Sequence, residues 1–342
     1  MSMLKIGNRF ISNSDKVYII AEACDNHMGN LDVAKEMCLR AKLAGADCIK
    51  FQHHLLDEEM LRDIPKSSNM EIPLYDFLKL HALSLDDHKI LMNYCKEIGI
   101  QYLCTPFSLK AAQELNDLGV DAFKIGSGEM TDIPTIREIA KFKKPMIIST
   151  GMCTFSEIER TYKVLCESDI DFAFTNCVSE YPPKYEDLNL NVISLMKEKF
   201  PNAIIGHSDH TPDIFTCFSA VTLGAKIIEK HVILDKMVSG PDQSVSIDFN
   251  ELYYLVNGIR KIECSLGSIK KVNENEKEIR EWAFRSIVTT RKIKKGETIS
   301  KEMIWSKRPG TGIPSFKMDE IIGKTALNDI DENVLLKYDD FM

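Results

Sequence analysis

Short apolar segments alternate with longer amphipathic ones along most of the chain. Eight short segments are apolar almost throughout, without alternation of apolar and polar residues, and several are rich in β-branched side chains. This pattern is typical of strands that are buried on both faces of a parallel sheet. The predicted strands are residues 18–23, 47–52, 102–107, 122–128, 145–150, 172–177, 203–208 and 226–232.

The segments between these strands have the spacing of amphipathic helices. Residues 31–45 and 84–99 each end at a glycine, and residues 108–119 and 154–168 follow the same order of polar cap, amphipathic run and stop. Strand and helix alternating eight times within about 250 residues predict an α/β fold, a (β/α)₈ TIM barrel. An open doubly wound sheet is the alternative, but no GxGxxG motif follows the first strand.

Three further segments divide the chain. Residues 53–83 are longer than a single helix requires, and an insertion after a barrel strand is expected to shape the substrate pocket. We predict a barrel domain over 1–265 and a polar linker or exposed helix over 266–284. Short β-like pieces punctuated by Gly and Pro then predict a small β-rich domain over 285–342. A domain of this size is expected to be stabilised by contacts with the barrel or with a partner subunit.

Composition narrows the cellular setting. The 342 residues carry a formal net charge of −8, which argues weakly against nucleic acid or an acidic membrane as a partner. No apolar run reaches the roughly 20 residues of a membrane span, and the N-terminus lacks the apolar stretch of a signal peptide. The ten cysteines form no CxxC pair and are expected to be reduced. We therefore expect a cytoplasmic protein.

Nearly every predicted strand finishes in polar or charged residues. In a (β/α)₈ barrel these carboxyl ends meet at one mouth, where active sites lie. Buried polar groups without partners cost roughly 1–3 kcal/mol each, so eight such ends at one mouth indicate a function. The residues are Glu22, Lys50, Gln52, Thr105, Lys124, Ser127, Glu129, Ser149, Ser179, Tyr181, His210 and His231.

Two histidines follow adjacent predicted strands. His210 closes the run GHSDHT and His231 closes IEKHV, and neighbouring strands lie about 4.8 Å apart. Two such imidazoles can share a divalent metal that acts as a Lewis acid on a carbonyl, with Glu22 on the next strand supplying a carboxylate. The alternative is that both histidines are core residues with hydrogen-bond partners. Asp242 follows the eighth strand in a Gly-Pro-Asp turn, and its spacing alone assigns it no role.

Two lysines, Lys50 and Lys124, lie within apolar strands, where an ammonium group needs an anion. Together with nearby hydroxyls they indicate a pocket for phosphate and carboxylate. In one alternative the lysines form salt bridges with Glu22 and Glu129. In another, one lysine forms a Schiff base, as in a metal-free aldolase. The hydroxyls are those of Ser127, Ser149, Ser179 and Ser208.

The order of the motifs resembles that of sialic acid synthases and related nonulosonic-acid synthases, over roughly residues 4–340. The resemblance implies a TIM barrel followed by an antifreeze-like SAF domain, and a domain-swapped homodimer. It also implies condensation of phosphoenolpyruvate with an open-chain N-acylated hexosamine such as N-acetylmannosamine, with release of phosphate, and a divalent metal, Mn²⁺ or Mg²⁺. The motifs are AEACDNHMGN, IKFQ, CTPF, FKIGSGEM, ISTGM, SEYP, GHSDHT, IEKHVILDK, SGPD and KRPGTGI.

The resemblance also implies a role for each matching position. His210 and His231 would bind the metal, and Glu22, Glu129 and Lys124 would be catalytic. Arg308 would reach the acyl group of the sugar from the neighbouring subunit. Phosphoenolpyruvate would contact Lys50, Thr105, Lys124, Ser127, Ser149, Ser179 and Ser208. The sugar would contact Gln52, Tyr181, Asp242, Phe284 and Arg308.

Some positions depart from the family pattern, and the identity of the sugar is therefore undetermined. Asp25, Ser179 and the FQHH run differ from the residues common in relatives, and these changes touch the sugar side or the phosphate rim. Sialic acid is the first product considered, and N,N'-diacetyllegionaminate, made from a 2,4-diacetamido hexose, is the alternative. A protein of another class, a non-catalytic carbohydrate binder, would need neither two buried lysines nor a histidine pair.

Overall fold

The computed structural model describes residues 2–64, 72–238, 240 and 242–342. The chain divides into two compact units, residues 1–266 and 267–342, which are described separately below. Part of the predicted insertion, residues 65–71, lies outside the described residues.

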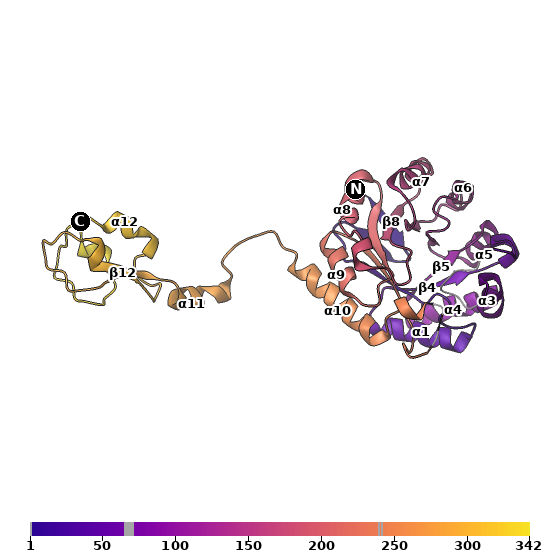
Figure 1. Ribbon diagram of the computed structural model, residues 1–342, viewed down its shortest axis with the longest axis horizontal. Coiled ribbons are helices and arrows are strands. Elements are labelled where there is room, and N and C mark those ends of the chain that lie inside the picture. The colour runs from indigo at the N-terminus through magenta and orange to yellow at the C-terminus, as the bar shows by residue number, and fades with distance from the viewer. Residues whose placement is uncertain (1, 65–71, 239, 241) are drawn as a thin grey trace. The chain divides into compact units, whose positions relative to one another are not determined.

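The first unit is built on eight parallel strands that nearly close into a barrel (Figure 1). The hydrogen-bonded order is β5-β4-β3-β10-β9-β8-β7-β6, and the two end strands β5 and β6 come into contact with each other. The predicted barrel is therefore confirmed, and the doubly wound alternative is wrong. The strands are β3 (Tyr18–Glu22), β4 (Cys48–His53), β5 (Gln101–Pro106), β6 (Phe123–Ile125), β7 (Met146–Ser149), β8 (Phe172–Cys177), β9 (Ile204–Asp209) and β10 (Ile227–His231).

Helices follow the barrel strands and lie around the outside of the ring (Figure 1). The four helices predicted from spacing are present as α1, α4, α5 and α7. Ser84 caps α4 in a capping box with Asp87, and Gly45 ends α1 in the left-handed conformation at φ 87°. The helices are α1 (Leu31–Ala44), α2 (Leu56–Glu59), α3 (Leu74–His81), α4 (Leu85–Ile98), α5 (Leu109–Leu118), α6 (Ile133–Ala140), α7 (Phe155–Glu167), α8 (Val192–Lys199), α9 (Phe215–Thr222) and α10 (Phe249–Ser265).

The interior of the barrel is apolar at one end and polar at the other. Side chains alternate between the two faces of a strand, so every second residue points inward. The apolar end is closed by an antiparallel hairpin, β1 (Met3–Ile6) and β2 (Arg9–Ser12), which the sequence pattern did not predict. The cluster that joins hairpin and barrel is Leu4, Ile6, Ile11, Tyr18, Ile20, Cys48, Leu103, Ala122, Ile147, Ala173, Ile204 and Ile227.

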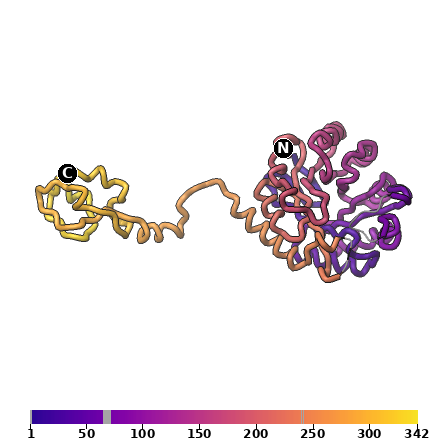
Figure 2. The backbone as a smooth tube through the Cα atoms, viewed as in Figure 1, coloured from indigo at the N-terminus to yellow at the C-terminus, as the bar shows by residue number. Residues whose placement is uncertain are grey.

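The second unit begins with an exposed helix, α11 (Glu274–Ala283), which has no buried residue. This helix lies within residues 266–284, the segment for which the sequence predicts a polar linker or an exposed helix. Two short strands, β11 (Ser286–Thr289) and β12 (Ile304–Lys307), pair antiparallel, and a short helix α12 (Met318–Ile321) follows. Most of the rest is turns and isolated bridges, which the backbone trace of Figure 2 follows around a small isoleucine-rich core.

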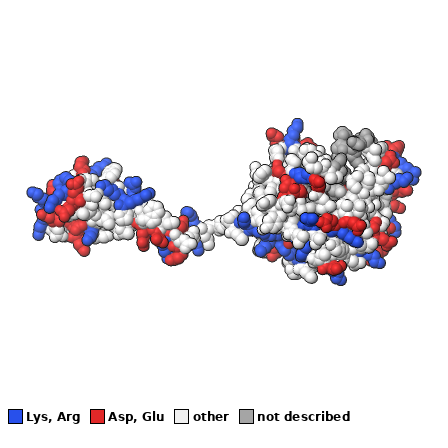
Figure 3. Space-filling model, turned by 90° about the horizontal axis from the view of Figure 1, so that it is seen from below, with Lys and Arg blue, Asp and Glu red and all other residues white. Residues whose placement is uncertain are grey.

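The surface carries charges of both signs. On the face shown in Figure 3, lysine and arginine side chains are interspersed with aspartate and glutamate. Within the described part of the chain, no helix is both long enough and apolar enough to cross a bilayer.

Candidate active site

A cavity of about 650 Å³ lies at the carboxyl ends of the barrel strands. All predicted site residues of the first unit line this cavity, whereas Phe284 and Arg308 belong to the second unit. The inward positions explain the clustering, because beyond the apolar floor the strands place polar side chains inside the barrel, two residues further on in most strands and four further on in β9, where Gly206 comes between Ile204 and Ser208. The predicted residues brought together are Glu22, Lys50, Gln52, Thr105, Lys124, Ser127, Glu129, Ser149, Ser179, Tyr181, Ser208, His210, His231 and Asp242.

Four buried charges form the centre of the cavity. Lys50 Nζ lies 2.8 Å from Glu22 Oε2 and donates a 3.1 Å hydrogen bond to Thr105 Oγ1. Glu229 lies between the two lysines, with its carboxylate oxygens 3.6 Å from Lys50 Nζ and 3.6 Å from Lys124 Nζ. The salt-bridge alternative is therefore right for Lys50 and Glu22, but the carboxylate beside Lys124 is Glu229 and not Glu129.

Glu229 is the main residue that sequence reasoning missed. It lies in the middle of β10, two residues before His231, so both side chains point into the barrel. Ser208 on β9 is its register partner and donates a 2.8 Å hydrogen bond to its Oε1. The alternation of inward positions back from His231 was the signal that could have found it.

The two lysines differ in electrostatic surroundings. Burial lowers the pKa of Lys50, but the carboxylates of Glu22 and Glu229 outweigh it and raise that pKa above its ordinary value. Burial also lowers the pKa of Lys124, and there Glu229 offsets only part of the effect. Lys124 therefore has the less compensated ammonium group, which an incoming anion would stabilise.

Hydroxyl groups line the part of the cavity wall that includes Lys124. Its Nζ donates a 2.6 Å hydrogen bond to Ser149 Oγ. The backbone N–H of Gly151 donates a 3.1 Å bond to Ser127 Oγ. A Cβ atom on Gly151 would lie 2.7 Å from Ser127 Oγ and 2.2 Å from Ser179 Oγ, so a glycine lets both hydroxyls approach the backbone.

Glu129 lines the same cavity with an unpaired carboxylate oxygen. Its Oε2 is buried and has no hydrogen-bond partner. Burial, with a contribution from the negative charge of Glu59, raises the pKa of Glu129 above its ordinary value. A carboxyl group in this setting can hold a proton and donate it during a reaction.

The two predicted metal ligands lie side by side. The ring centroids of His210 and His231 are 5.1 Å apart, and Tyr181 stacks on His210 at 4.3 Å. His210 Nδ1 donates a 2.7 Å hydrogen bond to the Val178 carbonyl, which leaves Nε2 as the atom available to a metal. The Nδ1 atom of His231 is buried without a hydrogen-bond partner. These donors fit a divalent cation.

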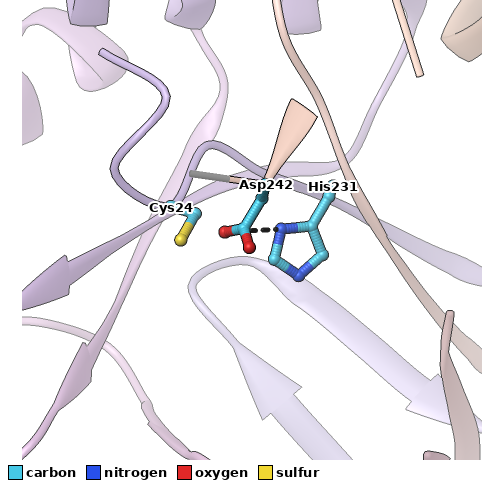
Figure 4. A group of neighbouring side chains, drawn as sticks. All are labelled: Cys24, His231 and Asp242. Atoms are coloured by element: carbon cyan, nitrogen blue, oxygen red, sulfur yellow. Dashed lines mark ion pairs between the residues drawn. The ribbon is translucent and has the colours of Figure 1, made fainter. Parts of the chain in front are cut away.

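A third and a fourth potential ligand lie beside His231 (Figure 4). Asp242 Oδ2 lies 3.4 Å from His231 Nδ1, and Cys24 completes a group whose ligand atoms all lie within 4.8 Å of one another. Gln52 Nε2 lies 3.2 Å from Cys24 Sγ and 3.0 Å from Glu22 Oε1. Sequence reasoning assigned Asp242 to the sugar and gave Cys24 no role, because a lone buried cysteine looks like a small apolar residue.

The insertion after β4 adds a second acidic and imidazole cluster. His54 Nδ1 lies 2.9 Å from Glu59 on α2, and Asp25 lies 3.9 Å from His54. Burial raises the pKa of Asp25 to about 7. Side chains of α3, among them Phe77, also line the cavity, which confirms for the described residues that this insertion shapes the pocket.

Two known family models match the chain. The model of the NeuB family matches residues 37–271, and the model of the SAF domain matches residues 284–342. The chain belongs to the NeuB family. Its SAF match confirms the antifreeze-like domain predicted at the C-terminal end.

Relatives of this NeuB-family protein are named as synthases of three different acids. It is 38% identical to the N,N'-diacetyllegionaminic acid synthase of Campylobacter jejuni, over 94% of this chain and 99% of the relative. It is 36% identical to a pseudaminic acid synthase of the same species, over 99% and 100%. The crystal structure of an N-acetylneuraminic acid synthetase from Leptospira borgpetersenii matches with a TM-score of 0.73 at 31% identity, over 82% of this chain and 95% of the other. The chain is accordingly a nonulosonic-acid synthase by family.

Proposed function

We propose that this protein condenses phosphoenolpyruvate with an open-chain N-acylated hexosamine to give a nine-carbon sialic-acid-like sugar and phosphate. One observation carries the proposal. A single cavity holds two buried ammonium groups among hydroxyls and, on a neighbouring part of its wall, two imidazoles suited to a metal. A non-catalytic carbohydrate binder would have no use for this combination of buried charges.

The lysine side of the cavity would hold phosphoenolpyruvate. Lys124, with the hydroxyls of Ser127, Ser149, Ser179 and Ser208 close to it, would bind the phosphate. Lys50 and Thr105, which are hydrogen-bonded to each other, would bind the carboxylate. Phosphoenolpyruvate is a trianion. When bound, it would neutralise part of the positive charge of the two ammonium groups that Glu229 now neutralises.

The imidazole side would hold the sugar aldehyde. A divalent metal bound at His210 and His231 would supply a Lewis acid for the aldehyde oxygen. Gln52, Tyr181 and Asp242 line this part of the cavity and would orient the open chain. The ring of Tyr181, stacked on His210, would exclude water from one side of the aldehyde.

The reaction then needs proton transfers near the carboxylates. The methylene carbon of phosphoenolpyruvate forms a bond to the aldehyde carbon, whose oxygen takes a proton to become a hydroxyl. Water adds to the carbon that bears the phosphate and loses one proton to become a hydroxyl group. That hydroxyl then loses its proton as the ketone C=O forms, the carbon–oxygen bond to phosphate breaks, and phosphate leaves with the bonding electrons. Glu22 would stabilise the positive charge that develops, and Glu129, with its raised pKa, would give and accept protons. No step needs a lysine Schiff base.

We propose a first candidate and an alternative for the sugar substrate. We take an N-acetylmannosamine-type hexose as the first substrate, and a 2,4-diacetamido hexose as the alternative. The legionaminic acid synthase among the relatives and the cluster of Asp25, His54 and Glu59 support keeping the alternative. This cluster adds hydrogen-bonding groups to the cavity that a second acylamino group could use.

The proposal includes a homodimer in the cytoplasm. Arg308 and Phe284 of one subunit would complete the sugar site of the other, as the resemblance implies. All ten cysteines are free thiols, which supports a reducing compartment.

Phosphate release tests the proposed function directly. The full-length protein is incubated with phosphoenolpyruvate and a panel of 2-acetamido and 2,4-diacetamido hexoses, with and without a chelator, and the nine-carbon product is identified by mass spectrometry. We expect phosphate release only with a sugar, loss of turnover after chelation, and recovery with Mn²⁺ or Mg²⁺. Sugar-independent release, or no release with any sugar, would contradict the proposal, and turnover that survives thorough chelation would contradict the metal role.

A further inference from the structure

Three side chains that can bind a metal lie close together at the ends of β3 and β10 (Figure 4). Cys24 follows β3, His231 ends β10, and Asp242 comes from the loop after β10. In the described part of the chain this is the one group of three such residues whose ligand atoms come within 4.8 Å of one another. Both Cys24 and His231 are about 95% buried, with 6% and 5% of their surface exposed.

The polar contacts within the group are incomplete. His231 Nδ1 is buried and makes no hydrogen bond, although Asp242 Oδ2 lies 3.4 Å from it. Gln52 Nε2 lies 3.2 Å from Cys24 Sγ, and an amide donor at that distance stabilises a sulfur that carries negative charge. An unpaired buried nitrogen beside a carboxylate and a sulfur indicates a missing cation.

The backbone at Cys24 is unusual for a residue with a side chain. Its φ is +47°, in the left-handed region that glycine adopts without strain. A glycine would fit this turn more easily, yet the chain places a thiol there. This backbone strain supports a binding role for the Cys24 side chain.

We propose that Cys24 and Asp242 join His231 as ligands of the metal, so that the site offers sulfur, nitrogen and oxygen donors to one ion. This proposal rests on the proposed function for the presence of a metal and adds which divalent metals the site binds more tightly than Mg²⁺. Soft thiolate donors favour Zn²⁺, Co²⁺ or Fe²⁺ over Mg²⁺, which prefers oxygen ligands. Cys24 binds as a thiolate: its sulfur–hydrogen bond is replaced by a sulfur–metal bond, and the proton passes to solvent.

Without a cation, the surroundings of Cys24 favour its protonated thiol. Burial, and then the negative charges of Asp242 and Asp25, raise the pKa of the Cys24 thiol well above its ordinary value. A divalent cation between Cys24 and Asp242 reverses the sign of the local field and favours the thiolate. His210, whose ring centroid lies 5.1 Å from that of His231, is placed to supply a further nitrogen.

Cobalt binding without any substrate tests the thiolate. The full-length protein carries Cys166→Ser and Cys264→Ser, which remove the two exposed thiols, and is freed of metal before Co²⁺ is added. We expect a near-ultraviolet sulfur-to-cobalt charge-transfer band. Cys24→Ser and Cys24→Gly abolish this band, and the glycine variant, which fits the positive φ, guards against a folding defect.

Cys177→Ser is the matched control. Cys177 is also buried in the cavity, with Sγ 3.8 Å from His210 Nδ1, but it is not part of the three-residue group. The band should persist in this variant. Absence of the band in the parent protein, its survival in both Cys24 variants, or its loss only in Cys177→Ser would overturn the proposal.

Metal selectivity gives a second readout. Loss of an outer-shell partner already lowers metal affinity about 10–100-fold, so Cys24→Gly should lower Zn²⁺ affinity more than about tenfold while Mg²⁺ affinity changes little. Equal losses for both metals would contradict a sulfur ligand. These assays contain no substrate, so a protein with the band but no phosphate release would refute the proposed function alone. Magnesium-supported turnover without the band would refute the thiolate alone.

Discussion

Lys230 Nζ donates a 2.7 Å hydrogen bond to Asp209 Oδ1, and neither side chain is exposed to solvent. The pair ties β10 to β9 on the outer face of the barrel, one residue before His231 and His210 respectively. Burial raises the pKa of Asp209, but the hydrogen bond from His207 and the charge of Lys230 outweigh it and hold that pKa well below its usual range. The pair thus fixes the two strand ends that carry the imidazoles.

Breaking this pair should be costly. Asp209→Asn or Lys230→Met leaves a buried group without its partner, and each should lower the free energy of unfolding by about 3–5 kcal/mol. The free energy of unfolding of the double variant should fall by less than the sum of the decreases in the two single variants. Urea unfolding of the metal-free protein measures all three.

An exposed ion pair provides the comparison. Lys163 lies 2.9 Å from Glu159 on the surface of α7, and Lys163→Met should cost no more than about 0.5 kcal/mol. If Lys230→Met costs as little as this surface change, the buried pair does not stabilise the strand ends.

Gly151→Ala should damage phosphoenolpyruvate binding. The new Cβ would lie 2.2 Å from Ser179 Oγ and 2.7 Å from Ser127 Oγ, so both hydroxyls must move away from the bound phosphate. Hydrogen bonds to a charged group contribute about 1.5–3 kcal/mol, so kcat/KM for phosphoenolpyruvate should fall by roughly 10- to 150-fold. Steady-state kinetics at saturating sugar measures the change.

Gly128→Ala is the matched control for this change. Gly128 lines the same cavity, but a Cβ there would meet nothing within 4 Å. The kcat/KM of Gly128→Ala for phosphoenolpyruvate should resemble that of the parent protein. If kcat/KM falls equally in Gly128→Ala and Gly151→Ala, steric displacement of the two serines does not cause the fall.

The sequence predicted the barrel part of the site because the fold obeys a simple period. Every second residue of a barrel strand points inward, and the strand ends open on one mouth, so Lys50, Lys124 and His231 could be brought together without coordinates. The same period contains Glu229, two residues before His231, but a prediction based on strand ends omits a carboxylate in mid-strand.

Other residues had no periodic signal. Cys24 follows a strand and looks apolar, and His54 with Glu59 lies in an irregular insertion, so only tertiary packing brings them to the cavity. The hairpin β1–β2 consists of two strands of four residues, too short to show a period. Its role appears only where Leu4 and Ile11 meet the apolar floor of the barrel.

Glu229→Gln should make phosphoenolpyruvate binding depend on pH. Burial lowers the pKa of Lys124 and Glu229 offsets it, so without that carboxylate the pKa of Lys124 falls further. The ammonium is then lost at a lower pH than in the parent. The KM for phosphoenolpyruvate should therefore rise with pH across a neutral to mildly alkaline range in which the parent KM is steadier.

The profile of KM against pH needs a control with the same change of side chain. Glu180 is an exposed residue at the cavity, and Glu180→Gln should leave the profile as it is in the parent. Parallel profiles for Glu229→Gln and the parent would mean that Glu229 does not support the charge of Lys124.

Arg308→Ala should weaken use of the sugar more than use of phosphoenolpyruvate. Within the second unit Arg308 Nε donates a hydrogen bond to the Ala283 carbonyl, and its guanidinium lies 5.5 Å from the ring of Trp282. A hydrogen bond from a charged donor to the acyl group is worth about 1.5–3 kcal/mol, so the KM for the sugar should rise about tenfold or more. Arg291→Ala, in the same unit, should leave it unchanged, and equal effects on both substrates would contradict the sugar role.

Complementation between subunits decides whether Arg308 acts across a dimer. A Lys124→Met subunit has a defective barrel with an intact Arg308, and an Arg308→Ala subunit has the reverse. If Arg308 serves the partner's barrel, a mixed dimer contains one site with both residues intact, and co-expressing the two variants under different tags restores turnover to the doubly purified species. If each Arg308 serves its own barrel, neither site of the mixed dimer is complete and its activity stays at the level of the Arg308→Ala protein. That second result would exclude the exchanged arrangement.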